Sequence, residues 1–239
     1  MKRDYHRWFS PSLGRDMELV VFGHAGSRVL AFPPCEGRFF DWEDRGMIAA
    51  VADWIDAGLF QITCVDSVDG EAWFADAKHP ADRAWRHAQY DAYLRYEVLP
   101  LTGQLNPDPC LITAGTSFGA YHALNFAFRY PDLVARTLSL SGLWDLRWRC
   151  DGYFDQTVYF HNPLDYLSGE HEAGRLGALR KMEIILAVGR DEYVLPNAER
   201  LSRILWDQGV WHALRVWDGP AHDWPCWQRM LRLYLRGPD

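Results

Sequence analysis

One serine stands in a pattern that can make it a nucleophile. The letters G-T-S-F-G occupy residues 115–119, with Ser117 at their centre, and follow an apolar run over residues 111–114. A G-x-S-x-G pattern between a strand and a helix predicts a tight turn that pushes the serine hydroxyl outward from a strained backbone. Gly115 and Gly119 fit this turn because a Cβ at either place would collide with a neighbouring strand or helix. Ser117 is therefore the candidate nucleophile; the alternative is an ordinary serine in a strand-to-helix turn.

A serine hydroxyl is a poor nucleophile until a base removes its proton, and the best candidate base is His222. Where a G-x-S-x-G serine lies between a strand and a helix, the catalytic residues follow the order serine, acid, histidine along the chain. His212 begins a predicted strand, and His161 and His171 lie in an aromatic-rich segment. His222 follows the last predicted strand and precedes the last predicted helix, which is where the base is expected.

The carboxylate that orients the histidine is expected after the preceding buried strand. There the sequence offers Asp191 and Glu192 side by side, two and three residues after Gly189. Aspartate is the commoner residue in this role and its shorter side chain suits a tight turn, but glutamate can also serve. Both residues remain candidates. Asp223 is a weaker candidate because neighbours in the chain rarely face each other correctly.

An oxyanion needs backbone N–H donors, and two are predicted. The helix after Ser117 begins near Phe118, whose N–H is free to donate because the first turn of a helix has no internal acceptor. The second donor is expected in a loop after an earlier strand. Pro33 and Pro34 have no N–H to give, so Cys35 is the candidate. The Cys35 thiol as a rival nucleophile is disfavoured because no base is assigned to it.

These side chains need a scaffold that brings distant segments together. A turn at residues 23–27 predicts a hairpin between the first two predicted strands. The alternation of strands with helices predicts one α/β domain over residues 1–239, with a mostly parallel sheet and helices on both faces. Ligands bind beyond the carboxyl ends of such strands, where all the candidates fall. Strands are predicted at residues 17–23, 28–33, 61–66, 111–114, 136–142, 183–189 and 212–217, and helices at 41–57, 80–101, 118–130, 197–209 and 224–235.

Residues 143–177 interrupt the alternation. This stretch is rich in aromatic side chains, contains Pro163 and several glycines, and shows no helical or strand period. A stretch this long without regular structure is typical of a lid or binding loop. We expect it to shape an apolar acyl or sugar-stacking pocket; simple packing over the sheet edge is the alternative.

Composition excludes several classes of function. The 239 residues carry a net charge of −7, so electrostatics do not favour a nucleic acid or an anionic membrane as partner. No apolar run approaches the roughly 20 residues that span a bilayer, and no signal peptide is evident. The five cysteines are scattered, without a C-x-x-C spacing, which predicts reduced thiols and a cytoplasmic protein. Neither H-E-x-x-H nor G-x-G-x-x-G in its strand-to-helix setting occurs, so no metal and no cofactor is predicted.

With these residues placed, the chain resembles the α/β-hydrolase superfamily over nearly its whole length. Within it, the chain is similar to the putative-esterase branch, which includes the esterase D (S-formylglutathione hydrolase) group and the mycobacterial mycolyltransferases. The letters H-D-W-P-C-W at 222–227 match the H-x-W-x-x-W ending of that branch, and Gly189 with Glu192 matches its acid loop. That register favours Glu192 over Asp191, and residues 33–35 lie where the branch places its second oxyanion donor.

The resemblance implies a three-layer α/β/α sandwich with a doubly wound sheet, and chemistry on a carboxylic ester. The leading hypothesis is a serine esterase acting on a small-molecule ester through an acyl-enzyme on Ser117. An acyltransferase with the same residues, in which an alcohol outcompetes water, is the second hypothesis. A non-catalytic ligand-binding protein on the same fold is the third.

Overall fold

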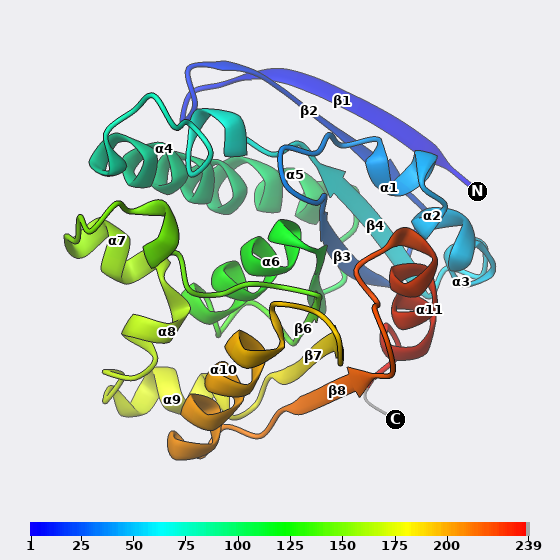
Figure 1. Cartoon of the computed structure of the whole chain (residues 1–239). Coiled ribbons are helices and arrows are strands. Elements are labelled where there is room, and N and C mark those ends of the chain that lie inside the picture. Colours follow the sequence, from blue (N-terminus) through cyan, green and yellow to red (C-terminus); the bar gives the residue numbers. More distant parts are fainter. Residues whose placement is uncertain (238–239) are drawn as a thin grey trace.

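The computed structural model describes residues 1–237. Over these residues the strands form one eight-stranded sheet in the order β1-β2-β4-β3-β5-β6-β7-β8 (Figure 1). The strands from β4 to β8 in this order run parallel, while β2 is antiparallel to both β1 and β4. The strands are β1 (Arg3–Ser10), β2 (Arg15–Phe22), β3 (Ser27–Phe32), β4 (Phe60–Val65), β5 (Leu111–Thr116), β6 (Arg136–Leu140), β7 (Glu183–Gly189) and β8 (Ala213–Trp217).

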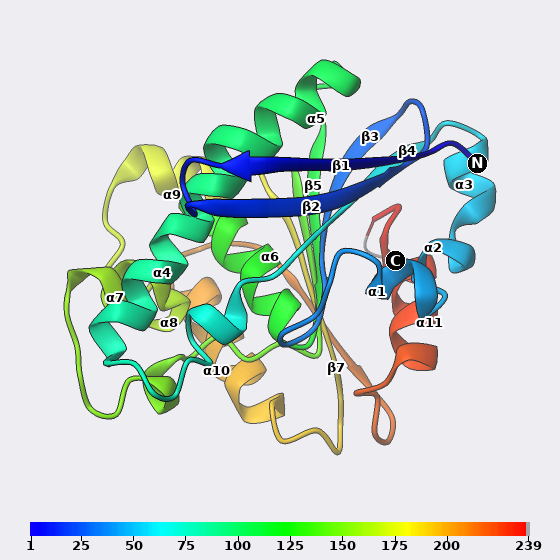
Figure 2. The same cartoon turned by 90° about the horizontal axis from the view of Figure 1, so that it is seen from above.

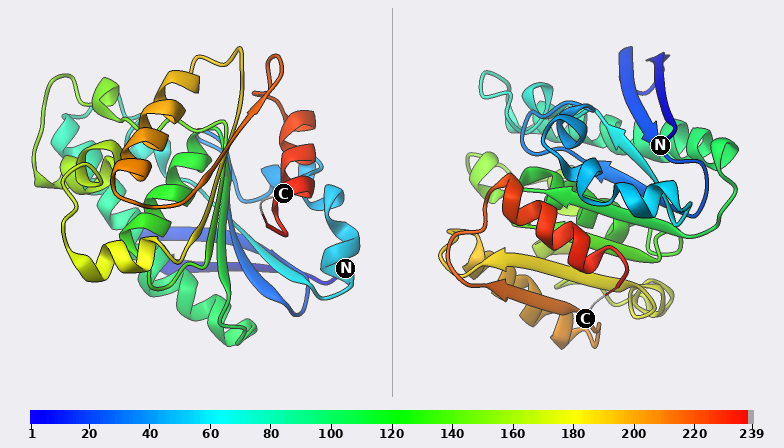
Figure 3. Two further views of the ribbon diagram at one scale, coloured as in Figure 1. Left: turned by 90° about the horizontal axis from the view of Figure 1, so that it is seen from below. Right: turned by 90° about the vertical axis from the view of Figure 1, so that its right-hand side faces the viewer.

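Helices cover both faces of the sheet, which confirms the predicted three-layer α/β/α sandwich. Figure 2 shows the sheet edge-on between the two helical layers. One layer holds α1 (Asp41–Asp44), α2 (Met47–Ala50), α3 (Ala52–Asp56) and α11 (Trp224–Tyr234); Figure 3 shows α11, in red, lying beside α1–α3 on this face. The other layer holds α4 (Pro80–Tyr93), α5 (Leu99–Leu105), α6 (Phe118–Arg129), α7 (Gln156–His161), α8 (Pro163–Tyr166), α9 (Ala173–Leu179) and α10 (Leu195–Asp207).

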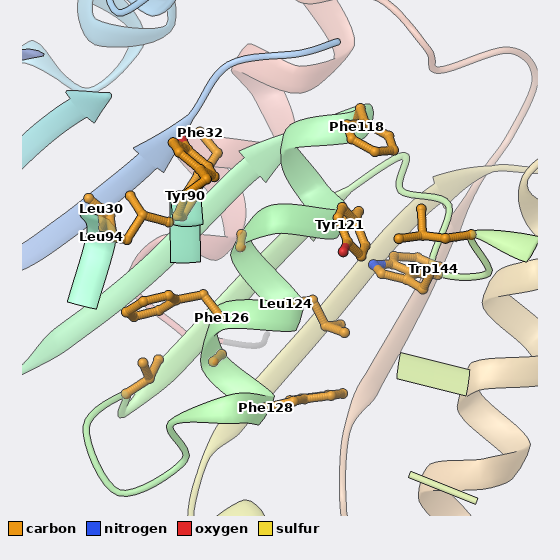
Figure 4. Close-up of a cluster of buried hydrophobic side chains, with 14 of the residues drawn as sticks. Leu30, Phe32, Tyr90, Leu94, Phe118, Tyr121, Leu124, Phe126, Phe128 and Trp144 are labelled. Carbon is orange, nitrogen blue, oxygen red and sulfur yellow. The ribbon is translucent and has the colours of Figure 1, made fainter. Parts of the chain in front are cut away.

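The buried strands contribute side chains to two hydrophobic cores, one on each face of the sheet, because successive side chains of a strand point to opposite faces. In β3, Leu30 and Phe32 pack into the core under α6, whereas Val29 and Ala31 pack into the core under α11. Figure 4 shows the first of these cores, with Tyr121 and Leu124 of α6 pointing into it. Packing in this core therefore fixes α6 along its length, and with it the turn at Ser117 from which α6 begins.

The predicted hairpin between residues 17–23 and 28–33 is wrong. β2 and β3 do not pair, because β4 lies between them, antiparallel to β2 and parallel to β3. β3 is buried along most of its length and occupies a central place, with β4 on one side and β5 on the other. The hairpin that does form joins β2 to β1. The sequence did not reveal β1 because its residues are largely polar and only partly buried.

The first two predicted helices also differ in detail. Residues 41–57 form three short helices instead of one. Gly46, with a positive φ of 76°, separates α1 from α2, and Val51, with φ −126°, separates α2 from α3. The predicted helix over residues 80–101 continues past Pro100 to Leu105. A π-helical turn, η2 (Leu94–Val98), joins α4 to α5, and Pro100 is the second residue of α5.

Residues 143–177 are not structureless, contrary to the prediction. They contain a 3₁₀ turn, η3 (Arg147–Arg149), and the helices α7 and α8, and they lead into α9. Asp155 caps α7 by accepting the Val158 N–H at 2.8 Å, and Pro163 starts α8. These helices are too short to show a period in the sequence. Trp144 and Leu164 of this segment are nevertheless buried in the core.

No helix within residues 1–237 combines the length and the apolar character that crossing a bilayer would require.

Candidate active site

The turn between β5 and α6 presents Ser117 at the carboxyl edge of the sheet. Ser117 has φ 54° and ψ −122°, a left-handed backbone that a residue with a side chain rarely adopts. Its N–H donates to the carbonyl oxygen of Leu140 at 2.8 Å, which fixes the turn to β6. A Cβ on Gly115 would overlap the carbonyl oxygen of Gly119, and a Cβ on Gly119 would overlap that of Pro33. Both glycines are therefore required for this turn.

His222 lies within hydrogen-bond distance of that serine. Its Nε2 is 2.9 Å from Ser117 Oγ, although the two residues are 105 positions apart. The imidazole packs edge-on against Trp227 of α11, with ring centroids 5.1 Å apart. Asp223 accepts the Cys226 N–H at 2.8 Å and so caps α11, which fixes the residue after the histidine. The structure gives Asp223 this capping contact instead of a contact with the imidazole.

Glu192 contacts the other nitrogen of the imidazole. Its Oε2 is 2.9 Å from His222 Nδ1, and its Oε1 accepts the Gly189 N–H at 2.6 Å and the Ser141 hydroxyl at 2.9 Å. Glu192 is only 7% exposed. With the carboxylate fixed in this way, the imidazole proton belongs on Nδ1, and Nε2 is left to accept from Ser117 Oγ.

Asp191 is not brought to this cluster. Its side chain is exposed, and its backbone N–H points to the Gly219 carbonyl oxygen at 3.4 Å. The turn after β7 explains the difference, because the Glu192 N–H donates back to the Gly189 carbonyl oxygen at 3.2 Å. The third residue after the glycine therefore folds inward, and the second faces solvent.

Ser141 is a site residue that the sequence did not reveal. It follows β6 with a positive φ of 56°, donates its hydroxyl to Glu192, and accepts the Trp227 indole N–H at 3.0 Å. It thus links the carboxylate to the helix that follows His222. The only signal in the sequence is Gly142 after a strand, which marks a turn but no role for the serine before it.

Phe118 and Cys35 line the same cavity as Ser117, which makes their backbone N–H groups the candidate donors to an oxyanion. Phe118 is the first residue of α6, so its N–H has no helical acceptor. In the loop after β3, the Glu36 N–H donates to Asp69 at 3.0 Å and the Gly37 N–H donates to the Pro34 carbonyl oxygen at 2.9 Å. Prolines have no N–H. Cys35 is left as the loop residue whose N–H meets no acceptor among residues 1–237.

The thiol of Cys35 is unsuited to act as a nucleophile. Although Cys35 is exposed as a residue, partial burial of its thiol, followed by the negative charges of Asp69 and Glu36, raises its pKa to about 12. The thiol therefore stays protonated at neutral pH, and only the thiolate is reactive.

A small cavity opens on the serine. It has a volume of about 140 Å³ and is lined by Cys35, Phe74, Ser117, Phe118, Ser141, Leu143, Trp148, Tyr193 and Val194. The Arg149 guanidinium makes cation–π contacts with two of these residues. It lies 4.4 Å from the ring centroid of Phe74 and 4.9 Å from that of Trp148. The cavity is thus largely apolar and aromatic, and Ser117 is one of the residues that line it.

The remaining candidate histidines lie elsewhere. His161 is buried against His87, with ring centroids 4.6 Å apart, and His212 lies 2.6 Å from the hydroxyl of Ser202. His171 is exposed, between α8 and α9. Within the described chain, no three His, Cys, Asp or Glu side chains are grouped so that they could hold a metal ion.

The sequence and the fold of this chain are similar to those of known esterases. The family described as "Putative esterase" matches residues 36–232. No curated protein matches the sequence. Among solved structures, a ferulic acid esterase superposes with a TM-score of 0.78 at 18% identity, over 97% of this chain and 95% of the other.

Two further structures share the fold. An S-formylglutathione hydrolase from Agrobacterium tumefaciens has a TM-score of 0.74 at 14% identity, with coverage of 98% and 93% of the two chains. A fluorophosphonate-binding serine hydrolase of Staphylococcus aureus has a TM-score of 0.67 at 14% identity, with coverage of 97% and 95%. At these identities the superpositions establish a common fold.

Proposed function

Since the chain belongs to the putative esterase family and is a carboxylic ester hydrolase, we propose that it works through an acyl-enzyme on Ser117, with His222 as base and Glu192 as the orienting acid. The observation that carries the proposal is the continuous contact from Ser117 Oγ through the imidazole to the buried carboxylate, at 2.9 Å on each side. A nucleophile, a base and an orienter in hydrogen-bond contact are the arrangement that serine hydrolysis requires.

In the acylation step, Ser117 Oγ attacks the acyl carbon of the ester and forms a new C–O bond. His222 Nε2 takes the hydroxyl proton, and the resulting imidazolium is stabilised by the Glu192 carboxylate. The tetrahedral intermediate then collapses. The bond to the alcohol oxygen breaks, and His222 returns the proton to the departing alcohol. The acyl group remains on Ser117.

In the deacylation step, water takes the place of the alcohol. His222 Nε2 removes a proton from the water as its oxygen attacks the acyl carbon. The second tetrahedral intermediate releases Ser117 Oγ, which recovers its proton from the imidazolium. The products are the carboxylic acid and the free enzyme.

The negative oxygen of both intermediates is proposed to lie between the Phe118 and Cys35 N–H groups. The positive end of the α6 dipole adds to their effect, since Phe118 opens a helix of 12 residues. Losing one such donor typically lowers kcat on the order of 10²–10³-fold.

The acyl group is proposed to occupy the cavity beside Ser117. An engineered cavity of about 150 Å³ in another protein holds benzene, so 140 Å³ suits a short aliphatic acyl group or one aromatic ring. Leu143 and Trp148 come from residues 143–177, and we propose that this segment walls the pocket. Trp148 is 52% exposed and so lies at the mouth.

A fluorophosphonate probe and p-nitrophenyl acetate test the proposal. We expect covalent labelling and turnover by the wild type, and neither by Ser117→Ala. The variant should also keep a melting temperature within a few degrees of the wild type. Absence of labelling and of turnover in the wild type would favour the non-catalytic ligand-binding protein.

Hydrolase and acyltransferase share every residue named above. Adding alcohol acceptors to the reaction and analysing the products separates them. A new ester formed at the expense of the free acid would favour the acyltransferase.

A further inference from the structure

A second acid–histidine pair lies beneath the proposed oxyanion loop and takes no part in the steps above. Asp69 Oδ1 is 2.7 Å from His122 Nε2, and the two residues are 1% and 2% exposed. A carboxylate can only accept hydrogen bonds, so His122 donates. A carboxylate buried to this degree is costly unless each oxygen has a donor.

The donor to the other oxygen is a backbone group of the oxyanion loop. Asp69 Oδ2 accepts the Glu36 N–H at 3.0 Å. Glu36 has a positive φ of 53°, which a glutamate adopts only where its surroundings impose it. The Gly37 N–H closes the turn on the Pro34 carbonyl oxygen at 2.9 Å. The peptide that follows Cys35 is therefore held in a left-handed turn by the Asp69 carboxylate.

His122 connects that carboxylate to the nucleophile helix. It lies in α6, five residues after Ser117, and its ring meets the Phe118 ring edge-to-face at 5.1 Å between centroids. It also stacks on Phe32 at the end of β3, at 6.0 Å. Asp69 itself belongs to η1 (Asp69–Glu71), which follows β4. The pair thus joins the segments after β3, β4 and β5.

We propose that Asp69 and His122 are positioning residues for the oxyanion hole. They hold the loop so that the Cys35 N–H points at the same place as the Phe118 N–H. This inference rests on the proposed function, because it concerns the donors of that reaction. It assigns Asp69 and His122 no contact with substrate.

The test is a graded set of variants. Asp69→Ala removes both contacts, whereas Asp69→Asn keeps an oxygen for the Glu36 N–H. Asp91→Ala is the matched control, because Asp91 is also buried, at 5% exposed, lies in α4, and accepts from Tyr130 at 2.6 Å and from Arg129 at 3.3 Å. His122→Gln keeps a donor for Asp69, whereas His122→Ala removes it and serves as the second test if Asp69→Ala does not fold.

With p-nitrophenyl acetate, we expect Asp69→Ala to lower kcat on the order of 10–100-fold, below the loss of a whole donor, with KM changed less than about threefold. Asp69→Asn and His122→Gln should keep most of the wild-type kcat, whereas His122→Ala should lower it as Asp69→Ala does. A trifluoromethyl ketone forms a tetrahedral adduct with a negative oxygen, so its affinity should fall by the same factor as kcat. Asp91→Ala should lose stability and keep both values.

Two results would overturn the inference. One is an Asp69→Ala enzyme that keeps kcat and trifluoromethyl ketone affinity near those of the wild type. The other is a series in which kcat follows melting temperature alone, so that Asp91→Ala loses as much activity as Asp69→Ala. Failure of the proposed function is separate, since it would show as a wild type that neither turns over ester nor reacts with the fluorophosphonate.

Discussion

Exchanging Glu192 for glutamine should nearly abolish turnover while leaving the fold in place. Oε1 of Glu192 accepts from the Gly189 N–H at 2.6 Å and from the Ser141 hydroxyl. The NH₂ group of a glutamine cannot face the Gly189 N–H, because both are donors. It must therefore take the place of Oε2 and point at His222 Nδ1, 2.9 Å away in the wild type.

The consequence is a change of tautomer. Nδ1 would accept from the amide, the imidazole proton would move to Nε2, and Nε2 could no longer accept the Ser117 proton. The equivalent acid-to-amide exchange in serine proteases costs about 10⁴ in kcat, which corresponds to about 5 kcal/mol of activation free energy. Folding should suffer far less. A neutral acceptor replaces a charged one, at a cost of about 1 kcal/mol, which lowers Tm by about 2–4 °C.

The measurement is kcat for p-nitrophenyl acetate on enzyme of known active-site concentration, with thermal unfolding in parallel. Asp191→Asn is the matched control. It changes the same functional group on the neighbouring residue, which is exposed, and should alter kcat less than about twofold. The reasoning fails if Glu192→Gln keeps kcat within tenfold of the wild type, or if Asp191→Asn is the variant that loses activity.

Three further outcomes are expected. Cys35→Ala should keep most of kcat, and iodoacetamide should modify Cys35 slowly at pH 8, because its pKa of about 12 leaves little thiolate; rapid modification would contradict this. Gly119→Ala should lose about 1–3 kcal/mol of stability and much of kcat, since its Cβ would push on the Pro33 carbonyl at the base of the oxyanion loop; urea unfolding and ester turnover measure both. Burial holds the pKa of His87 well below 6.5 in the folded protein, so only the unfolded chain binds a proton there as pH falls. The free energy of unfolding should thus decline below about pH 6.5, by up to about 1.4 kcal/mol per pH unit for this group, and His87→Gln should flatten the decline in urea titrations between pH 7.5 and 5.

The parts of the fold that could be predicted from the sequence are those with a strong local signal. β5 and β7 are largely apolar runs, and the turn at Ser117 is specified by glycines whose neighbours leave no room for a Cβ. β1 was missed because an edge strand that is only partly buried needs no apolar pattern. The pairing of β2 with β4 could not be predicted either, because it depends on which strand occupies the centre of the sheet.

The residues of the site also differ in how far the sequence predicts them. Ser117 and His222 follow from motif and chain order. The choice between Glu192 and Asp191 depends on the direction in which a turn points its side chains, and a family register favoured the residue that lies beside His222. Ser141 and Asp69 could not be predicted. Their contacts join segments 51 and 53 residues apart, and no local pattern marks them.

The separation of Ser117 and His222 along the chain has a consequence for synthesis. A ribosome that has added Ser117 must add 105 more residues before the His222 imidazole exists, and Trp227, whose indole N–H donates to Ser141, comes later still. The central strands and α6 can already assemble in that interval. The nascent chain would then carry a formed turn and an unactivated hydroxyl, so ester cleavage should begin only when α11 docks as the last helix of the sandwich.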